Sequence, residues 1–216
     1  MNRLEKSEDE TMKALCVALL NYGAAAQEYF GYRTDDLMNA GLTAEQQALV
    51  AAYDASYFQG AVAPDSTKLG AFAATDSGFP TKGSSVSFDG AFAINYYIAP
   101  SQEPQGDMQL YIWTPADYAA ASALTADNAS EIITMERQEN GAYWAQADGI
   151  AAKMLDETYY VAGVYTDEDG NTCSTGIIAY SLSKYCINNA KPGKDMQELA
   201  ANTAMYGYYA KQYFTT

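Results

Sequence analysis

The stretch SSVSFDGAFAINYYI, residues 84–98, decides the fold class of this chain. The dipeptide Asp89-Gly90 separates two runs of strand-forming residues, and Asp-Gly is a strong signal for a tight hairpin turn. Apolar side chains then recur at every second position, at Phe92, Ile94, Tyr96 and Ile98. This period of two predicts an antiparallel hairpin with one face in a core.

The same pattern continues on the C-terminal side of this hairpin. Residues 108–113 alternate between polar and apolar side chains, and residues 115–125 fit either a short helix or a loop. Two further pairs of strand-like runs surround turns rich in Asn, Asp and Gly: 132–137 with 142–147, and 158–166 with 172–180. Hairpins at short spacing, with no long helix between them, predict an antiparallel β-sandwich rather than a parallel sheet.

Helical patterns flank this β-rich region. The N-terminal one begins with the capping-box sequence Ser7-Glu8-Asp9-Glu10, continues with apolar residues at helical spacing, and reaches a suitable end at Gly31. Thr43 is positioned to cap a second helix, and Leu49, Val50 and Tyr53 are expected to face inward. A short helix starts after Ser181 or Ser183, and a final helix is expected over 195–214.

The expected fold is therefore mainly β with α-helices, an antiparallel β-sandwich flanked by N-terminal and C-terminal helices that pack together. We expect an N-terminal helical segment at 1–60, the β-sandwich at 61–180, and C-terminal helices at 181–216 that pack on the N-terminal segment.

The final helix repeats the first. A shift of 184 residues (206 − 22) superposes Tyr22-Gly23 on Tyr206-Gly207, with seven identities over the 19 positions from 12 to 30. Glycine costs roughly 1 kcal/mol in a helix interior, so two glycines in register indicate close packing against another element. The repeat favours a tandem architecture, in which the chain carries the closing helix of a preceding unit and then one whole unit.

Composition narrows the classes of partner. The net charge is −15, from 12 basic and 27 acidic residues, and no basic run is present, which argues against nucleic-acid binding. No stretch of about 18 apolar residues exists, so we expect no membrane insertion. Residues 1–6 are too polar for a signal peptide, and we expect a segment of a longer protein.

The residue types needed for most catalytic and metal sites are missing. The sequence has no histidine, and its three cysteines, at 16, 173 and 186, form no CxxC, so we expect no zinc site. No metal-binding residue and no cofactor is assigned, and calcium binding at irregular loops is left open. A Cys173–Cys186 disulfide is one alternative, and buried thiols are the favoured one. Asp167, Asp169 and Asn171 fit a hairpin turn better than a calcium loop. A glycosidase needs only two carboxylates, but no pair stands out, and the chain is expected not to be an enzyme.

Binding by aromatic side chains is the chemistry that the sequence does suggest. Sugar rings have apolar faces that stack on aromatic rings, and their hydroxyls need planar polar partners. Trp113 ends a strand and Trp144 follows a turn, and for each the alternative is a core anchor. Adjacent strand residues face opposite ways, so Trp144 is exposed only if Tyr143 points inward. The candidate carbohydrate-binding residues are Trp113, Asp117, Tyr118, Arg137 and Trp144.

Three segments carry a family resemblance. The runs ALLNYGAAAQEYFGY (18–32), VSFDGAFAINYY (86–97) and STGIIAYSLSKY (174–185) resemble modules of cell-surface proteins of anaerobic gut bacteria, and most of all starch-adherence proteins of ruminococcal amylosomes. The resemblance implies an extracellular, surface-attached, non-catalytic module. It supplies no matched binding residues.

We therefore expect a non-catalytic module that binds a polysaccharide or oligosaccharide, with an α-glucan such as starch as the ligand, next to other domains of a longer surface protein. The alternative is a structural or adhesive spacer repeat with no glycan ligand of its own.

Overall fold

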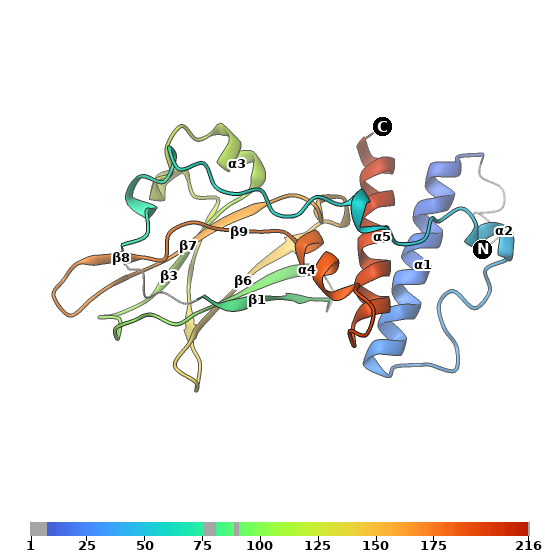
Figure 1. Ribbon diagram of the computed structural model, residues 1–216, viewed down its shortest axis with the longest axis horizontal. Coiled ribbons are helices and arrows are strands. Elements are labelled where there is room, and N and C mark those ends of the chain that lie inside the picture. The colour runs from blue at the N-terminus through green and yellow to red at the C-terminus, as the bar shows by residue number, and fades with distance from the viewer. Residues whose placement is uncertain (1–7, 76–80, 89–90, 216) are drawn as a thin grey trace. The chain divides into compact units, whose positions relative to one another are not determined.

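The computed structural model describes residues 8–75, 81–88 and 91–215 (Figure 1). The chain divides into two compact units. The helical unit comprises 1–60, 151–156 and 182–216, and the sandwich unit comprises 61–150 and 157–181. The short segment 151–156, expected in the β-sandwich, thus belongs to the helical unit.

The first sheet of the sandwich unit has the strand order β1-β2-β6-β5 and is antiparallel throughout. Its strands are β1 (Thr81–Ser87), β2 (Phe92–Ile98), β5 (Glu136–Arg137) and β6 (Tyr143–Ile150). The pairing of Ser87 with Ala93 confirms the predicted hairpin. Its turn, Asp89-Gly90, lies outside the described residues.

The second sheet has the order β4-β3-β7-β8, and β9 also pairs with β7. Its antiparallel strands are β3 (Gln109–Trp113), β4 (Glu131–Thr134), β7 (Tyr159–Thr166), β8 (Thr172–Ser174) and β9 (Ile178–Tyr180). The second half of the predicted hairpin at 172–180 is therefore two short strands, separated at Gly176, which has φ +74°. Together the two sheets confirm the predicted antiparallel β-sandwich.

The predicted strand at 132–137 is wrong in one respect, because the chain changes sheets within it. Residues 131–134 pair with β3 in the second sheet, whereas Glu136 and Arg137 pair with β6 in the first. Buried Met135 sits at the change, and its backbone N–H donates to the Met108 carbonyl over 2.8 Å.

The core between the sheets follows the alternation of the strands. Ile94, Tyr96 and Ile98 of β2 are at most 1% exposed. A Cβ placed on Gly163 of β7 would lie 2.6 Å from Ile98 Cδ1, so the absence of a side chain there admits the isoleucine of the facing sheet.

A further layer covers the outer face of the second sheet, formed by segment 61–75 and the turns around α3 (Pro115–Ala120) and η3 (Ala126–Asn128), and Figure 1 shows α3 over this side. Segment 61–75 includes the 3₁₀ turn η2 (Gly70–Phe72). The layer encloses an aromatic cluster made of Phe72, Trp113, Tyr118, Leu124, Tyr160 and Ala162.

The helical unit is built around two long helices, α1 (Glu10–Phe30) and α5 (Gln197–Thr215), which run antiparallel in Figure 1. Asp9 caps α1 by accepting a hydrogen bond from the Met12 N–H, and Gly31 ends it in the left-handed conformation. Ser7 of the predicted capping box lies outside the described residues. The shorter elements are α2 (Ala44–Gln47), η1 (Ala55–Tyr57), η4 (Ala152–Met154) and α4 (Leu182–Asn189).

The two repeated helices pack together, as expected. Ala14 and Ala18 of α1 share a buried cluster with Met205 and Tyr209 of α5, and Leu49, Val50 and Tyr53 pack against it. The repeated tyrosines Tyr22 and Tyr206 stack on each other, with ring centroids 5.6 Å apart.

All three cysteines are free thiols. Only Cys186 is fully buried, whereas Cys16 and Cys173 are half-buried, so the expectation of three buried thiols is wrong for two of them.

Candidate functional site: the outer face of the first sheet

The outer face of the β1-β2-β6-β5 sheet carries two aromatic rings side by side. On β2 and β6 the inward residues Tyr96 and Tyr143 are 1% and 7% exposed, so their neighbours Tyr97 and Trp144 point outward and are half-buried. Tyr97 and Trp144 face each other directly across the strands. The Cβ atoms of such a pair lie about 4.5–5.5 Å apart. The sheet therefore presents a two-ring platform, defined here as Tyr97 and Trp144.

A cluster of polar side chains adjoins this platform. Asn95 Oδ1 accepts hydrogen bonds from Trp144 Nε1 over 3.1 Å and from Gln146 Nε2 over 3.0 Å. Asn95 Nδ2 donates to Ser85 Oγ over 3.2 Å. These residues come from three adjacent strands, since Ser85 pairs with Asn95 and Asn95 pairs with Gln146. The cluster holds the indole towards β2 and fixes its orientation.

The arrangement suits a ligand that has apolar faces and hydroxyl groups. The two rings offer contact area at a low cost in side-chain entropy, because a hydrogen bond already orients the indole. The Gln146 amide oxygen accepts no hydrogen bond from the described residues, and the Ser85 hydroxyl can donate one. Exposed Glu136, which pairs with Trp144 across the strands, adds a carboxylate at the edge.

Trp113 lies elsewhere and has no exposed surface. It points to the outer face of the second sheet, where its ring packs on the Phe72 ring with centroids 4.8 Å apart. Its Nε1 donates a hydrogen bond to Asn128 Oδ1 over 2.9 Å. An indole with 0% exposure presents no face to a ligand in this conformation. This burial supports the alternative that Trp113 is a core anchor. The indole is buried because a further layer covers the outer face of this sheet.

Asp117 and Tyr118 lie at the same corner as Trp113 and have structural partners there. Asp117 Oδ2 accepts hydrogen bonds from Ser130 and Thr114, which lower the pKa of this carboxyl. The Tyr118 ring is 8% exposed and stacks on Tyr160 with centroids 3.5 Å apart. A hollow of about 440 Å³ beside Asp117 is lined by polar and alanine side chains and by no aromatic ring.

Arg137 is exposed but does not face the platform. It pairs across the strands with Tyr143, whereas its neighbour Glu136 pairs with Trp144, so Arg137 and Trp144 lie on opposite faces of the sheet. Its guanidinium forms an ion pair with Glu103 at 3.1 Å. Of the five predicted site residues, the structure thus places only Trp144 on this platform.

Four residues of the site were missed at the sequence level: Ser85, Asn95, Tyr97 and Gln146. The signal was available for Tyr97 and Asn95, because the alternation that puts Ile94, Tyr96 and Ile98 inward necessarily turns their neighbours outward. Their meeting with Gln146 depends on the register between β2 and β6, which no local pattern specifies.

The other candidate features have local explanations. Asp167 Oδ1 accepts the backbone N–H groups of Asp169 and Asn171, which supports the hairpin-turn interpretation, and these hydrogen bonds lower the pKa of Asp167. Within the described ranges, no group of three or more acidic or thiol side chains is placed to hold a metal ion. No helix in the same ranges is long and apolar enough to span a bilayer.

Comparisons with protein-family models, with curated proteins and with solved structures found no match for this chain. Function is therefore inferred from the geometry of the chain and from the resemblance noted in its sequence.

Proposed function

We propose that the chain is a non-catalytic carbohydrate-binding module whose ligand is a neutral polysaccharide, with an α-glucan as the expected one. The observation that carries the proposal is the two-ring platform of Tyr97 and Trp144, which faces outward while Tyr96 and Tyr143 fill the core.

The platform has the two properties that sugar recognition requires. Its rings can stack on the apolar face of a pyranose, while Gln146 and Ser85 hydrogen-bond the hydroxyls at the ring edge. The net charge of −15 disfavours anionic ligands and leaves neutral ones. The resemblance to starch-adherence modules is the support for an α-glucan in particular.

Affinity gel electrophoresis with amylopectin, dextran, hydroxyethylcellulose and xylan tests the proposal. We expect amylopectin to retard the unmodified chain, and Trp144→Ala and Tyr97→Ala each to abolish most of the retardation, because each substitution removes one of the two apolar faces on which the sugar would stack. Tyr32→Ala is the matched control, since Tyr32 is 67% exposed but belongs to the helical unit.

The outcomes test separately whether the chain binds carbohydrate and whether that carbohydrate is an α-glucan. Retardation by another glycan that still depends on Trp144 would keep carbohydrate binding and replace the α-glucan. Unchanged mobility of the folded chain in all four gels would reject the proposal. The spacer alternative would then take its place, favoured by the repeated helices and the stacking of Tyr22 on Tyr206.

A further inference from the structure

One line of paired residues crosses all four strands of the first sheet. Gly83 of β1 pairs with Tyr97 of β2, and Tyr97 pairs with Trp144 of β6. Trp144 in turn pairs with Glu136 of β5. Directly paired residues of neighbouring strands share one face of a sheet, so all four positions lie on the outer face. This line of four residues is called the platform row below.

The spacing of the platform row matches the repeat of a glycan chain. Neighbouring strands lie about 4.8 Å apart, so the row extends over about 14 Å from the first strand to the fourth. One strand spacing is close to the length that each pyranose unit adds to a glycan chain. Tyr97 and Trp144 stand on neighbouring strands, so they can stack on consecutive sugar units of a chain that lies across the strands.

Both ends of the platform row are open. At the β1 end Gly83 is exposed, and a Cβ on it would meet no heavy atom of the described residues within 4 Å, its chain neighbours apart. At the β5 end Glu136 is exposed on an edge strand. Recognition of a terminal sugar requires a concave site that encloses it. An open glycine and an exposed carboxylate form no such enclosure, so a chain can continue past both ends.

A second line of residues follows the platform row two positions along the strands. It consists of Ser85 on β1, Asn95 on β2 and Gln146 on β6, which pair with one another in that order. Because the two lines run side by side, the polar one follows the edge of any chain stacked on the rings. Ser85 and Gln146 lie two strands apart, so they can hydrogen-bond hydroxyls of the first and the third of three consecutive sugar units.

We propose that the platform row binds the interior of an unbranched glycan stretch that lies across the strands, with three consecutive sugar units over β1, β2 and β6. This inference rests on the proposed function and adds to it the binding mode and the smallest complete ligand. The ligand class is a linear polysaccharide stretch whose chain ends are not recognised. The unit over β1 lies above Gly83, where a larger side chain would take its place.

Titration calorimetry with glucose, maltose, maltotriose and maltoheptaose tests the binding mode. We expect the association constant to rise from glucose to maltose as the second ring is used. It should rise again by about three- to tenfold from maltose to maltotriose, the effect of one further hydrogen bond. Longer chains should then gain only in proportion to the number of three-unit positions that they offer. If the gels select another polysaccharide, its oligosaccharides of the same lengths are titrated.

Chemical change at the end of the chain tests whether the ends are recognised. Borohydride converts the reducing unit of maltoheptaose into an open-chain alditol and leaves the other units intact. A site that binds the interior of the chain should bind the reduced and the untreated maltoheptaose with the same affinity.

Glu136→Trp is a variant that should gain affinity. The substitution adds a third ring to the platform row at an exposed strand position, where Trp is well accommodated. We expect it to tighten maltoheptaose binding by about fivefold, because the added indole buries more apolar surface of the chain. Arg137→Trp is the matched control, since Arg137 is also exposed but pairs with Tyr143 and lies on the opposite face.

The outcomes distinguish failure of this inference from failure of the proposed function. Maltose that binds as tightly as maltoheptaose, in a manner that still requires Trp144, would keep carbohydrate binding and overturn the binding mode alone. Loss of affinity on reduction of the chain end, or equal effects of Glu136→Trp and Arg137→Trp in folded proteins, would do the same. If the folded chain binds no glycan in the gels or the calorimeter, both proposals fail.

Discussion

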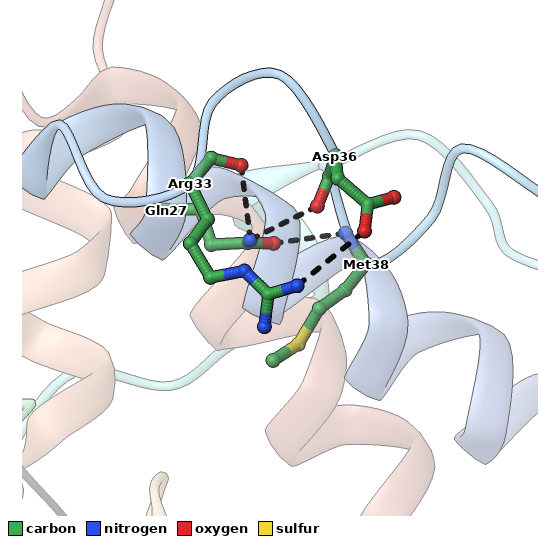
Figure 2. Close-up of polar contacts among 4 residues, drawn as sticks. All are labelled: Gln27, Arg33, Asp36 and Met38. Carbon is green, nitrogen blue, oxygen red and sulfur yellow. Dashed lines mark hydrogen bonds and ion pairs between the residues drawn. The ribbon is translucent and has the colours of Figure 1, made fainter.

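Single side chains decide how the long segment after α1 is held. Residues 31–43 contain no helix or strand, and amide groups tie them to α1: Asn21 receives a hydrogen bond from Asn39 over 2.9 Å, and Gln27 binds three backbone groups of loop 33–38 (Figure 2). Gln27 is 7% exposed, so its amide has exchanged water for these partners. The buried amide of Gln27 therefore fixes the position of loop 33–38 on α1.

Cys186 makes the stability of the helical unit depend on pH in the alkaline range. It is fully buried under α5, and desolvation raises the pKa of its thiol from 9.0 to about 12. The folded state thus binds a proton that the unfolded state loses above pH 9.0, so the stability from this group is complete below pH 9.0 and is lost as the pH rises towards about 12.

We expect the free energy of unfolding to fall between pH 9 and pH 10 with a slope of up to about 1.4 kcal/mol per pH unit. Cys186→Ala should flatten this slope. Urea titrations of the two proteins at several pH values measure it, and equal slopes in both would refute the assignment. Above pH 10.0, half-buried Tyr22, with its pKa raised to about 12 by desolvation, adds to the decline.

At the scale of elements, the two helix glycines have unequal roles. A Cβ at Gly207 would meet the Cβ, Cγ and Cδ1 atoms of buried Leu155, including the root of the side chain, which cannot swing away. A Cβ at Gly23 would come within 3.0 Å only of the Sδ atom near the end of exposed Met38. Alanine also favours a helix by about 1 kcal/mol over glycine.

Gly207→Ala should therefore destabilise the chain by about 1–3 kcal/mol, the usual cost of overpacking. Gly23→Ala should be neutral or stabilise it by up to about 1 kcal/mol. Urea unfolding followed by far-ultraviolet circular dichroism compares the two. Equal effects of the two substitutions would show that residue 155 does not set the packing of α5.

The same elements show which parts of the fold local sequence can predict. The hairpins, the Thr43 cap and the Gly31 stop were predicted because each depends on residues close together in the chain. The change of sheet at Met135 was not, since it depends on pairing with β3 and β6 at a distance. For Trp113 the sequence left a surface ring and a core anchor both open, because alternation assigns the residue to a face without revealing the layer above that face.

For the whole molecule, the long-range contribution to stability is the electrostatic repulsion that comes from its excess of acidic residues. The 27 acidic residues exceed the 12 basic ones, and the ion pairs formed within the described residues are four in number, each with at least one partner substantially exposed. Such pairs contribute about 0–1 kcal/mol each, so they do not offset the repulsion among the remaining carboxylates.

Raising the ionic strength with sodium chloride should therefore stabilise the chain. Between about 0.01 M and 0.15 M the Debye length falls from about 30 Å to about 8 Å, which screens most of this repulsion. We expect the urea midpoint to rise over this range. The rise should shrink when the exposed acids Glu28, Asp35 and Glu168 are replaced by Gln, Asn and Gln, and a midpoint that falls with salt would contradict the account.

Trp113 is fully buried and Trp144 is half-buried, so the two tryptophans differ in their access to solvent and their fluorescence can report on the platform. Acrylamide in solution reaches the fluorophore on the platform and is kept from the one beneath α3. Emission can thus be divided into a quenchable and an unquenchable component, and the second serves as an intensity standard. Occupation of the platform by any molecule becomes visible as shielding of the first component, without a label and before the occupant is known.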